Sequence, residues 1–171
     1  NLVAAVGTAI REQMPREAVR ACLAAMEALR AVGPVEKAVS LASEVDLVPG
    51  VSVRDRVLLG VDWGWCLHLA GHGEAGLLKV REALGQATGL GESRLEARCR
   101  DGLSRQLLQL GKLAEAGVEL EAGLASVEDS GALRAALLEG KGAWCLRRGD
   151  AIEADRILGE ALRQAREHGV P

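Results

Sequence analysis

The sequence predicts an all-α protein, a solenoid of about four helix-turn-helix repeats that follow a leading partial repeat. The apolar share is 49% but the aromatic share is only 2%, so the core is built from Leu, Ala and Val rather than from the aromatic residues that strands prefer. Apolar residues recur at helical spacing, as Leu103, Leu107 and Leu110 do. Glycines recur at nearly constant intervals, which indicates an internal repeat.

Four glycines mark this repeat at intervals of 38, 40 and 38 residues: Gly33, Gly71, Gly111 and Gly149. A small residue lies five positions after each of them: Ala38, Gly76, Ala116 and Ala154. A second small or apolar residue lies twelve positions after each: Val45, Ala83, Gly123 and Ala161. We expect each glycine to end a helix in a left-handed cap, and the small residues to let the next helix pack closely against it. Because one helix pair cannot cover its apolar stripe, the pairs are expected to stack.

In chain order, the predicted helices span residues 2–13, 17–31, 35–46, 53–69, 74–88, 92–109, 113–128, 131–147 and 151–168. Residues 1–15 carry the trailing helix of a truncated repeat, and the repeats cover about 19–50, 53–90, 92–130 and 131–168. We therefore expect one repeat domain over 1–171. The longest break between helices contains Pro49 and Gly50, and Ser52 is expected to cap the helix that follows.

The repeat resembles the tetratricopeptide repeat over about residues 19–168. Its fourth unit carries the pattern best, with Gly142, Gly149, Ala154, Ala161 and Leu162, and Trp63-Gly64 occupies the leucine–glycine position of the second unit. The resemblance implies a right-handed α–α superhelix with an open concave surface that binds another molecule. Two features depart from the pattern: Leu67, Leu107 and Cys145 replace its aromatic residues, and the period exceeds the usual 34 or so. Longer units of this kind resemble the sensor arrays of bacterial multidomain transcription regulators.

Charge and apolar patterning argue against several partners. Basic and acidic residues number 21 and 24, for a formal net charge of -3, so direct nucleic-acid binding is not expected. No apolar run approaches the roughly 20 residues that span a bilayer. The four cysteines are too far apart for a zinc knuckle or a redox motif, which predicts buried free thiols in a cytoplasmic protein. Because the chain begins at Asn1, we expect it to be a piece of a longer protein.

No catalytic, cofactor or metal site is predicted. Residues 71–76 match the letters of a dinucleotide fingerprint, but a predicted helix precedes them where that fingerprint requires a strand. His68 and His72 have a ligand-like spacing, yet Gly71 is expected to end the helix between them. Ser104 lacks the second glycine of a nucleophile elbow.

The first helix of each repeat is expected to line the concave surface. The predicted partner-binding residues there are Arg20, Glu27, Arg30, Trp65, His68, Arg98, Asp101, Arg105, Gln109, Glu139 and Arg147. Trp63 lies on the inner stripe and is expected in the core, whereas Trp65 points about 160° away at about 100° per residue and is a candidate hot spot.

Three functions are compatible with such a surface. The first is a non-catalytic scaffold that binds a protein or peptide within a larger bacterial regulatory protein. The alternatives are a sensor domain of a transcription regulator that binds a small effector in the groove, and a self-association module that forms a homodimer.

Overall fold

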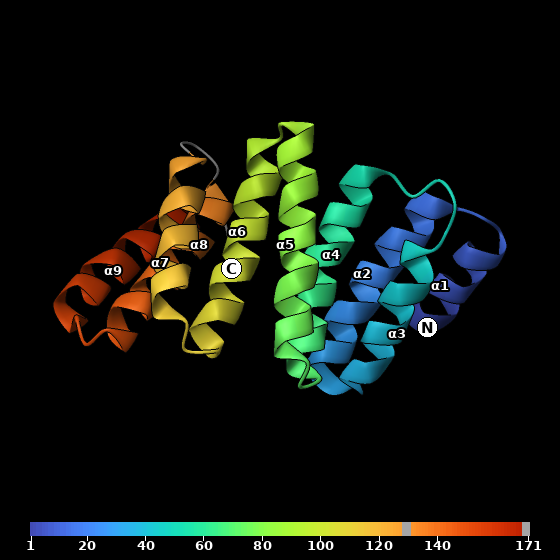
Figure 1. Ribbon diagram of the computed structural model, residues 1–171, viewed down its shortest axis with the longest axis horizontal. Coiled ribbons are helices and arrows are strands. Elements are labelled where there is room, and N and C mark those ends of the chain that lie inside the picture. The colour runs from blue at the N-terminus through green and yellow to red at the C-terminus, as the bar shows by residue number, and fades with distance from the viewer. Residues whose placement is uncertain (128–130, 169–171) are drawn as a thin grey trace. The chain divides into compact units, whose positions relative to one another are not determined.

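The computed structural model describes residues 1–127 and 131–168, and the helices of these residues form the fold (Figure 1). They are α1 (Leu2–Arg11), α2 (Pro15–Val32), α3 (Val35–Asp46), α4 (Val53–Leu69), α5 (Gly73–Leu90), α6 (Ser93–Gln109), α7 (Leu113–Ala125), α8 (Gly131–Arg147) and α9 (Ala151–Glu167). The described residues contain no strand, so the all-α prediction is confirmed, and the helix bounds lie close to the predicted ones. The predicted helix 113–128 ends earlier, at Ala125, and residue 128 lies outside the described part.

The chain divides into two compact units, unit 1 (Asn1–Leu90) and unit 2 (Gly91–Pro171). In unit 1 each helix packs against the next, and α2 also packs against α4 and α1 against α3 (Figure 1). In unit 2 the helices likewise pack in chain order, and α6 also packs against α8. Within each unit, helices therefore pack in sequence-adjacent pairs, and the first helices of successive pairs lie in contact.

The repeat-marking glycines act as predicted at three of four positions. Gly71, Gly111 and Gly149 have φ of +87°, +73° and +83°, the left-handed conformation that favours glycine. The prediction for Gly33 is wrong, because its φ of -128° and ψ of -179° are extended. Pro34 follows it, and the proline ring disfavours helical conformations in the preceding residue.

The small residues after these glycines are buried, as predicted. Ala38, Ala116 and Ala154 each have 0% exposure, and Gly76 is also buried. With no larger side chain at these positions, the second helix of a pair can lie close to the first.

Side-chain caps are present at the N-termini of α4 and α9, and the first of these was predicted from the sequence. The Asp55 amide donates to Ser52 Oγ at 3.1 Å, so the predicted cap of α4 is confirmed. At α9, the Glu153 amide donates to the Asp150 carboxylate at 3.1 Å, a cap the sequence analysis did not identify. Both caps satisfy amides that have no partner within the helix.

Burial of the four cysteines is also confirmed: all are free thiols in the interior. Across the described residues, none of the helices combines the length and the apolar character that crossing a membrane requires.

Candidate binding surfaces

The predicted partner-binding residues fall into two sets, one on each unit. In unit 1 they are Arg20, Glu27 and Arg30 on α2, with Trp65 and His68 on α4. In unit 2 they are Arg98, Asp101, Arg105 and Gln109 on α6, with Glu139 and Arg147 on α8. Because α2 contacts α4 and α6 contacts α8, the residues of each set lie on neighbouring first helices of one unit. We call these the unit 1 and unit 2 first-helix surfaces.

The unit 1 surface is organised around an ion pair between its two helices. Arg30 Nη1 donates to Asp62 Oδ1 at 2.6 Å, and the two side chains are 23% and 19% exposed. Burial acts to lower the pKa of Arg30, but the hydrogen bond and charge of Asp62 outweigh it and raise this pKa above its ordinary value. The guanidinium of Arg30 is therefore paired with the carboxylate of Asp62. Sequence reasoning missed Asp62, although it lies one helical turn before Trp65.

Trp65 and His68 form the aromatic part of the same surface. Their rings are stacked, with centroids 5.2 Å apart and planes inclined by 11°, as neighbours three residues apart on a helix can be. Both side chains are half-buried, so Trp65 is less exposed than a free hot spot would be. Nδ1 of His68 is buried and has no hydrogen-bond partner among the described residues. A ligand that supplied one would remove a cost in free energy.

The unit 2 surface is organised around a carboxylate withdrawn from water. Asp101 is 14% exposed, and Arg105 grips both of its oxygens, Nη2 at 3.1 Å from Oδ2 and Nε at 3.2 Å from Oδ1. Burial raises the pKa of Asp101, and the charge of Glu139 on α8 raises it further, against the opposing charges of Arg105 and Arg98. Glu139 on α8 is therefore near enough to act on Asp101 electrostatically, and Arg105 is the cation that Asp101 contacts.

Arg147 has a structural partner instead. Its guanidinium donates to the carbonyl of Leu108, near the carboxyl end of α6, and so joins α8 to the turn in which the Gly111 amide donates to the same carbonyl. The remaining members, Arg20, Glu27, Arg98, Gln109 and Glu139, are exposed.

The other two tryptophans pack between helices. Trp63 is half-buried against the core of unit 1, in agreement with its predicted place. Trp144, which the sequence analysis did not place, packs against the core of unit 2 and donates its indole N–H to the carbonyl of Leu113 at 2.7 Å.

Side chains that can act as nucleophiles or metal ligands include Ser104, the cysteines and the histidines. Ser104 is fully buried, and its hydroxyl donates to the Asp101 carbonyl at 2.8 Å. Burial raises the pKa of Cys22 to about 12 and that of Cys66 to about 11, which keeps both thiols neutral and unreactive near pH 7. His68 lies in the last turn of α4 and His72 beyond its end, so the predicted break between them is confirmed. The described residues hold no group of three or more His, Cys, Asp or Glu side chains placed to bind a metal ion.

Comparison of the chain with protein-family models found no match. Comparisons with curated proteins and with solved structures likewise found none.

Proposed function

We propose that this chain is a non-catalytic binding module, a tetratricopeptide-like right-handed array within a larger bacterial regulatory protein. Its ligand is a protein or peptide segment that places a basic side chain on a first-helix surface. Support comes from the stacking of helix pairs inside each unit and from the turns made by Gly71, Gly111 and Gly149. Direct binding to nucleic acid or to a membrane is not part of the proposal.

The observation that carries this proposal is the acidic part of the unit 2 surface, where partly buried Asp101 and exposed Glu139 interact electrostatically. Burial and Glu139 both disfavour the charge of Asp101, Arg105 offsets this by contacting both of its oxygens, and Glu139 adds a second, exposed negative charge. Such a charge stabilises a complex when a cationic group from a partner approaches it and the pair is shielded from water. Exposed Glu139 gives a basic side chain access to the same region.

The test compares two labelled peptides of equal length, one alternating Arg with Leu and one alternating Glu with Leu, by fluorescence anisotropy. We expect the basic peptide to bind at least tenfold more tightly, and Asp101→Asn to remove most of that preference. Asp155→Asn, at an exposed position of α9, is the matched control and is expected to change nothing. Equal affinity for the two peptides would sink the proposal for this surface.

Trp65 tests the unit 1 surface. If the partner also covers the Trp65–His68 stack, Trp65→Ala lowers peptide affinity at least tenfold while the circular dichroism spectrum is unchanged. Leu78→Ala, at an exposed position of α5, is the control for loss of apolar area. Unchanged affinity in Trp65→Ala would place the partner elsewhere.

A second candidate is an effector-sensing role, favoured by the unpartnered Nδ1 of His68 beside an aromatic ring. A nucleotide-binding module upstream and a helix-turn-helix downstream in the full-length gene would support it. Self-association is the third candidate, and sedimentation of the chain as a monomer at high concentration would dismiss it.

A further inference from the structure

Each unit contains a hollow between three consecutive helices, and the two hollows occupy equivalent places in the repeat. Gly71 and Gly149 lie 78 positions apart, so the same shift relates α3, α4 and α5 to α7, α8 and α9. The unit 1 hollow is bounded by the first three of these helices and the unit 2 hollow by the last three. Under this shift Arg56 corresponds to Arg134, and Glu82 to Glu160, in the linings of both hollows.

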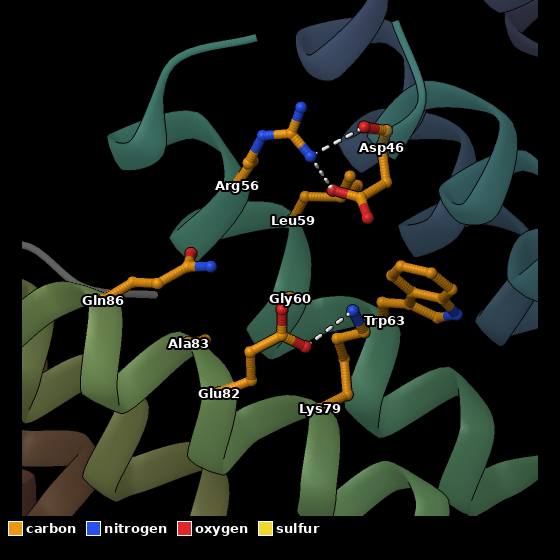
Figure 2. Close-up of a pocket in the computed structure, with 9 residues that line it drawn as sticks. All are labelled: Asp46, Arg56, Leu59, Gly60, Trp63, Lys79, Glu82, Ala83 and Gln86. Atoms are coloured by element: carbon orange, nitrogen blue, oxygen red, sulfur yellow. Dashed lines mark hydrogen bonds and ion pairs between the residues drawn. The ribbon is translucent and has the colours of Figure 1, made fainter.

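Unit 1 fills its hollow with its own side chains. Figure 2 shows Arg56 reaching Asp46, whose Oδ1 and carbonyl oxygen lie 2.8 Å and 2.7 Å from Nη1. The indole of Trp63 forms one wall, with Lys79 Nζ 4.3 Å from its ring centroid, a cation–π contact. The space left is about 30 Å³, enough for about one water molecule.

At the positions that correspond to Asp46 and Trp63, unit 2 has neither a carboxylate nor an indole. Leu124 stands where unit 1 has Asp46, and Lys141 stands where it has Trp63. Lys141 turns to Glu121, with Nζ 2.7 Å from Oε1. The hollow is correspondingly larger, about 360 Å³, which lies in the usual size range of small-molecule sites.

The larger hollow has an apolar floor and a rim of charged side chains of both signs. Leu138 and Ile157, which are 5% and 1% exposed, belong to its lining. Arg134 and Arg156 lie at its rim with Glu160, which is 3.9 Å from Arg134 Nη2 and 4.0 Å from Arg156 Nη1. Glu160 is therefore close to both guanidinium groups but within hydrogen-bonding distance of neither.

Arg134 differs from Arg56, its counterpart in unit 1, in how closely a carboxylate approaches its guanidinium. Arg56 has a carboxylate oxygen at 2.8 Å, whereas the Glu160 oxygen near Arg134 lies 3.9 Å away. Arg134 Nη1 donates to the Val127 carbonyl at 3.2 Å, so among the described residues further N–H groups of its guanidinium remain for an acid. Arg156, by contrast, already holds both oxygens of Glu153, at 2.6 Å and 2.8 Å.

We infer that the unit 2 hollow binds a small aromatic carboxylate, with the ring over the floor that Leu124, Leu138 and Ile157 form and the acid group on Arg134. At the two positions where unit 1 has a carboxylate and an indole, unit 2 has Leu124 and Lys141, although Glu121 and Glu160 line other parts of its hollow. An aromatic acid restores the ring and the carboxylate, because its ring removes apolar surface from water and its carboxylate forms charge-assisted hydrogen bonds with a guanidinium. This site shares α8 with the unit 2 first-helix surface but none of the residues of that surface, so it is independent of the function proposed there.

The test follows isoleucine methyl groups by NMR in the full chain. The sequence has three isoleucines, and they sample different environments: Ile157 in the hollow, Ile152 on the same helix at 88% exposure, and Ile10 in unit 1. Indole-3-propionate is expected to shift the Ile157 δ1 methyl saturably, and to leave Ile152 and Ile10 unmoved. Tryptamine, which keeps the ring and reverses the charge, and propionate, which lacks the ring, are expected to bind at least tenfold more weakly.

Two variants and one control make the test specific. Arg134→Gln is expected to weaken indole-3-propionate binding at least tenfold, and Arg163→Gln, at an exposed position of α9, to leave it unchanged. Lys141→Trp recreates the indole of unit 1 and is expected to abolish binding while the Ile157 resonance remains that of a folded protein. The inference is overturned if Ile157 does not shift, if tryptamine binds equally well, or if Lys141→Trp binds like the wild type. It is also overturned as a small-molecule site if the blocked dipeptide N-acetyl-Asp-Trp-amide binds more tightly than the free acid.

Discussion

The indole of Trp144 lies directly against Gly117, so that a Cβ atom placed on this glycine would come within 2.9 Å of the ring carbon Cζ2. The ring is fixed from two further directions, by the hydrogen bond to the Leu113 carbonyl and by the Arg148 guanidinium 4.4 Å from its centroid. It cannot move away without losing these contacts. Gly117 is therefore a glycine that helix packing requires, although it stands in the middle of a helix.

We predict that Gly117→Ala lowers the free energy of unfolding of the chain by about 1–3 kcal/mol, the usual cost of overpacking a well-filled contact. Gly159 is the matched control, because it also lies inside a helix and an added Cβ there meets nothing within 4 Å. Gly159→Ala is expected to raise this free energy by about 0.4–1 kcal/mol, since alanine restricts the unfolded chain more than glycine does. Urea denaturation followed by circular dichroism measures both, and equal stability of the two variants would contradict the packing argument.

The ion pair between Arg30 and Asp62 is expected to stabilise unit 1 measurably. A double-mutant cycle with Arg30→Gln and Asp62→Asn should give a coupling free energy of about 1 kcal/mol, because both side chains are partly withdrawn from water. The pair between Arg156 and Glu153 has the same 2.6 Å separation but lies on an exposed surface, so its cycle should give a smaller coupling. Addition of salt should reduce the second coupling more than the first. Couplings of equal size would show that burial does not govern these pairs.

The buried thiols predict a loss of stability at high pH. Burial raises the pKa of Cys22 and of Cys99 to about 12, and that of Cys66 to about 11, from an ordinary value of 9.0. The folded state therefore favours the neutral thiols. Their contribution is complete below pH 9 and is lost as the pH rises through 11 to 12, so the free energy of unfolding should decline from about pH 9 upward.

Reactivity toward a thiol reagent checks the same burial at pH 8. We expect 5,5′-dithiobis(2-nitrobenzoate) to label the cysteines only as fast as the chain unfolds, with full labelling in urea. Rapid labelling of Cys22 without denaturant would contradict the burial described here.

Asp101→Asn is expected to raise the Tm of the chain at pH 7. Burial and Glu139 raise the pKa of Asp101, which means that the folded state favours its protonated form. The stability contributed by this group is present below the pKa of the unfolded chain and is lost as pH rises through the folded value, so the charge is unfavourable at pH 7. The gain from Asn should therefore shrink toward pH 3, as measured by thermal unfolding at several pH values, and Asp155→Asn should show no such trend.

Much of the fold could be predicted from the sequence because its causes are local. Helix ends follow from turn residues such as Gly71 and from caps such as Ser52, and the burial of Ala38 or Ala116 follows from their spacing. The error at Gly33 arose from a local rule that was not applied, the effect of Pro34 on the residue before it. The candidate surfaces could be predicted only as lists of helix positions.

The sequence by itself therefore determined which segments are helical, where they turn and which small residues and thiols are buried. Only the tertiary structure decided which groups meet, such as Arg30 with Asp62 and Trp144 with the Leu113 carbonyl, and that unit 2 has an open hollow where unit 1 is filled. The physical reason is that propensity, capping and spacing act within a few residues of the chain. Contacts between residues some thirty positions apart depend instead on how two helices are placed and on the volume of every side chain between them.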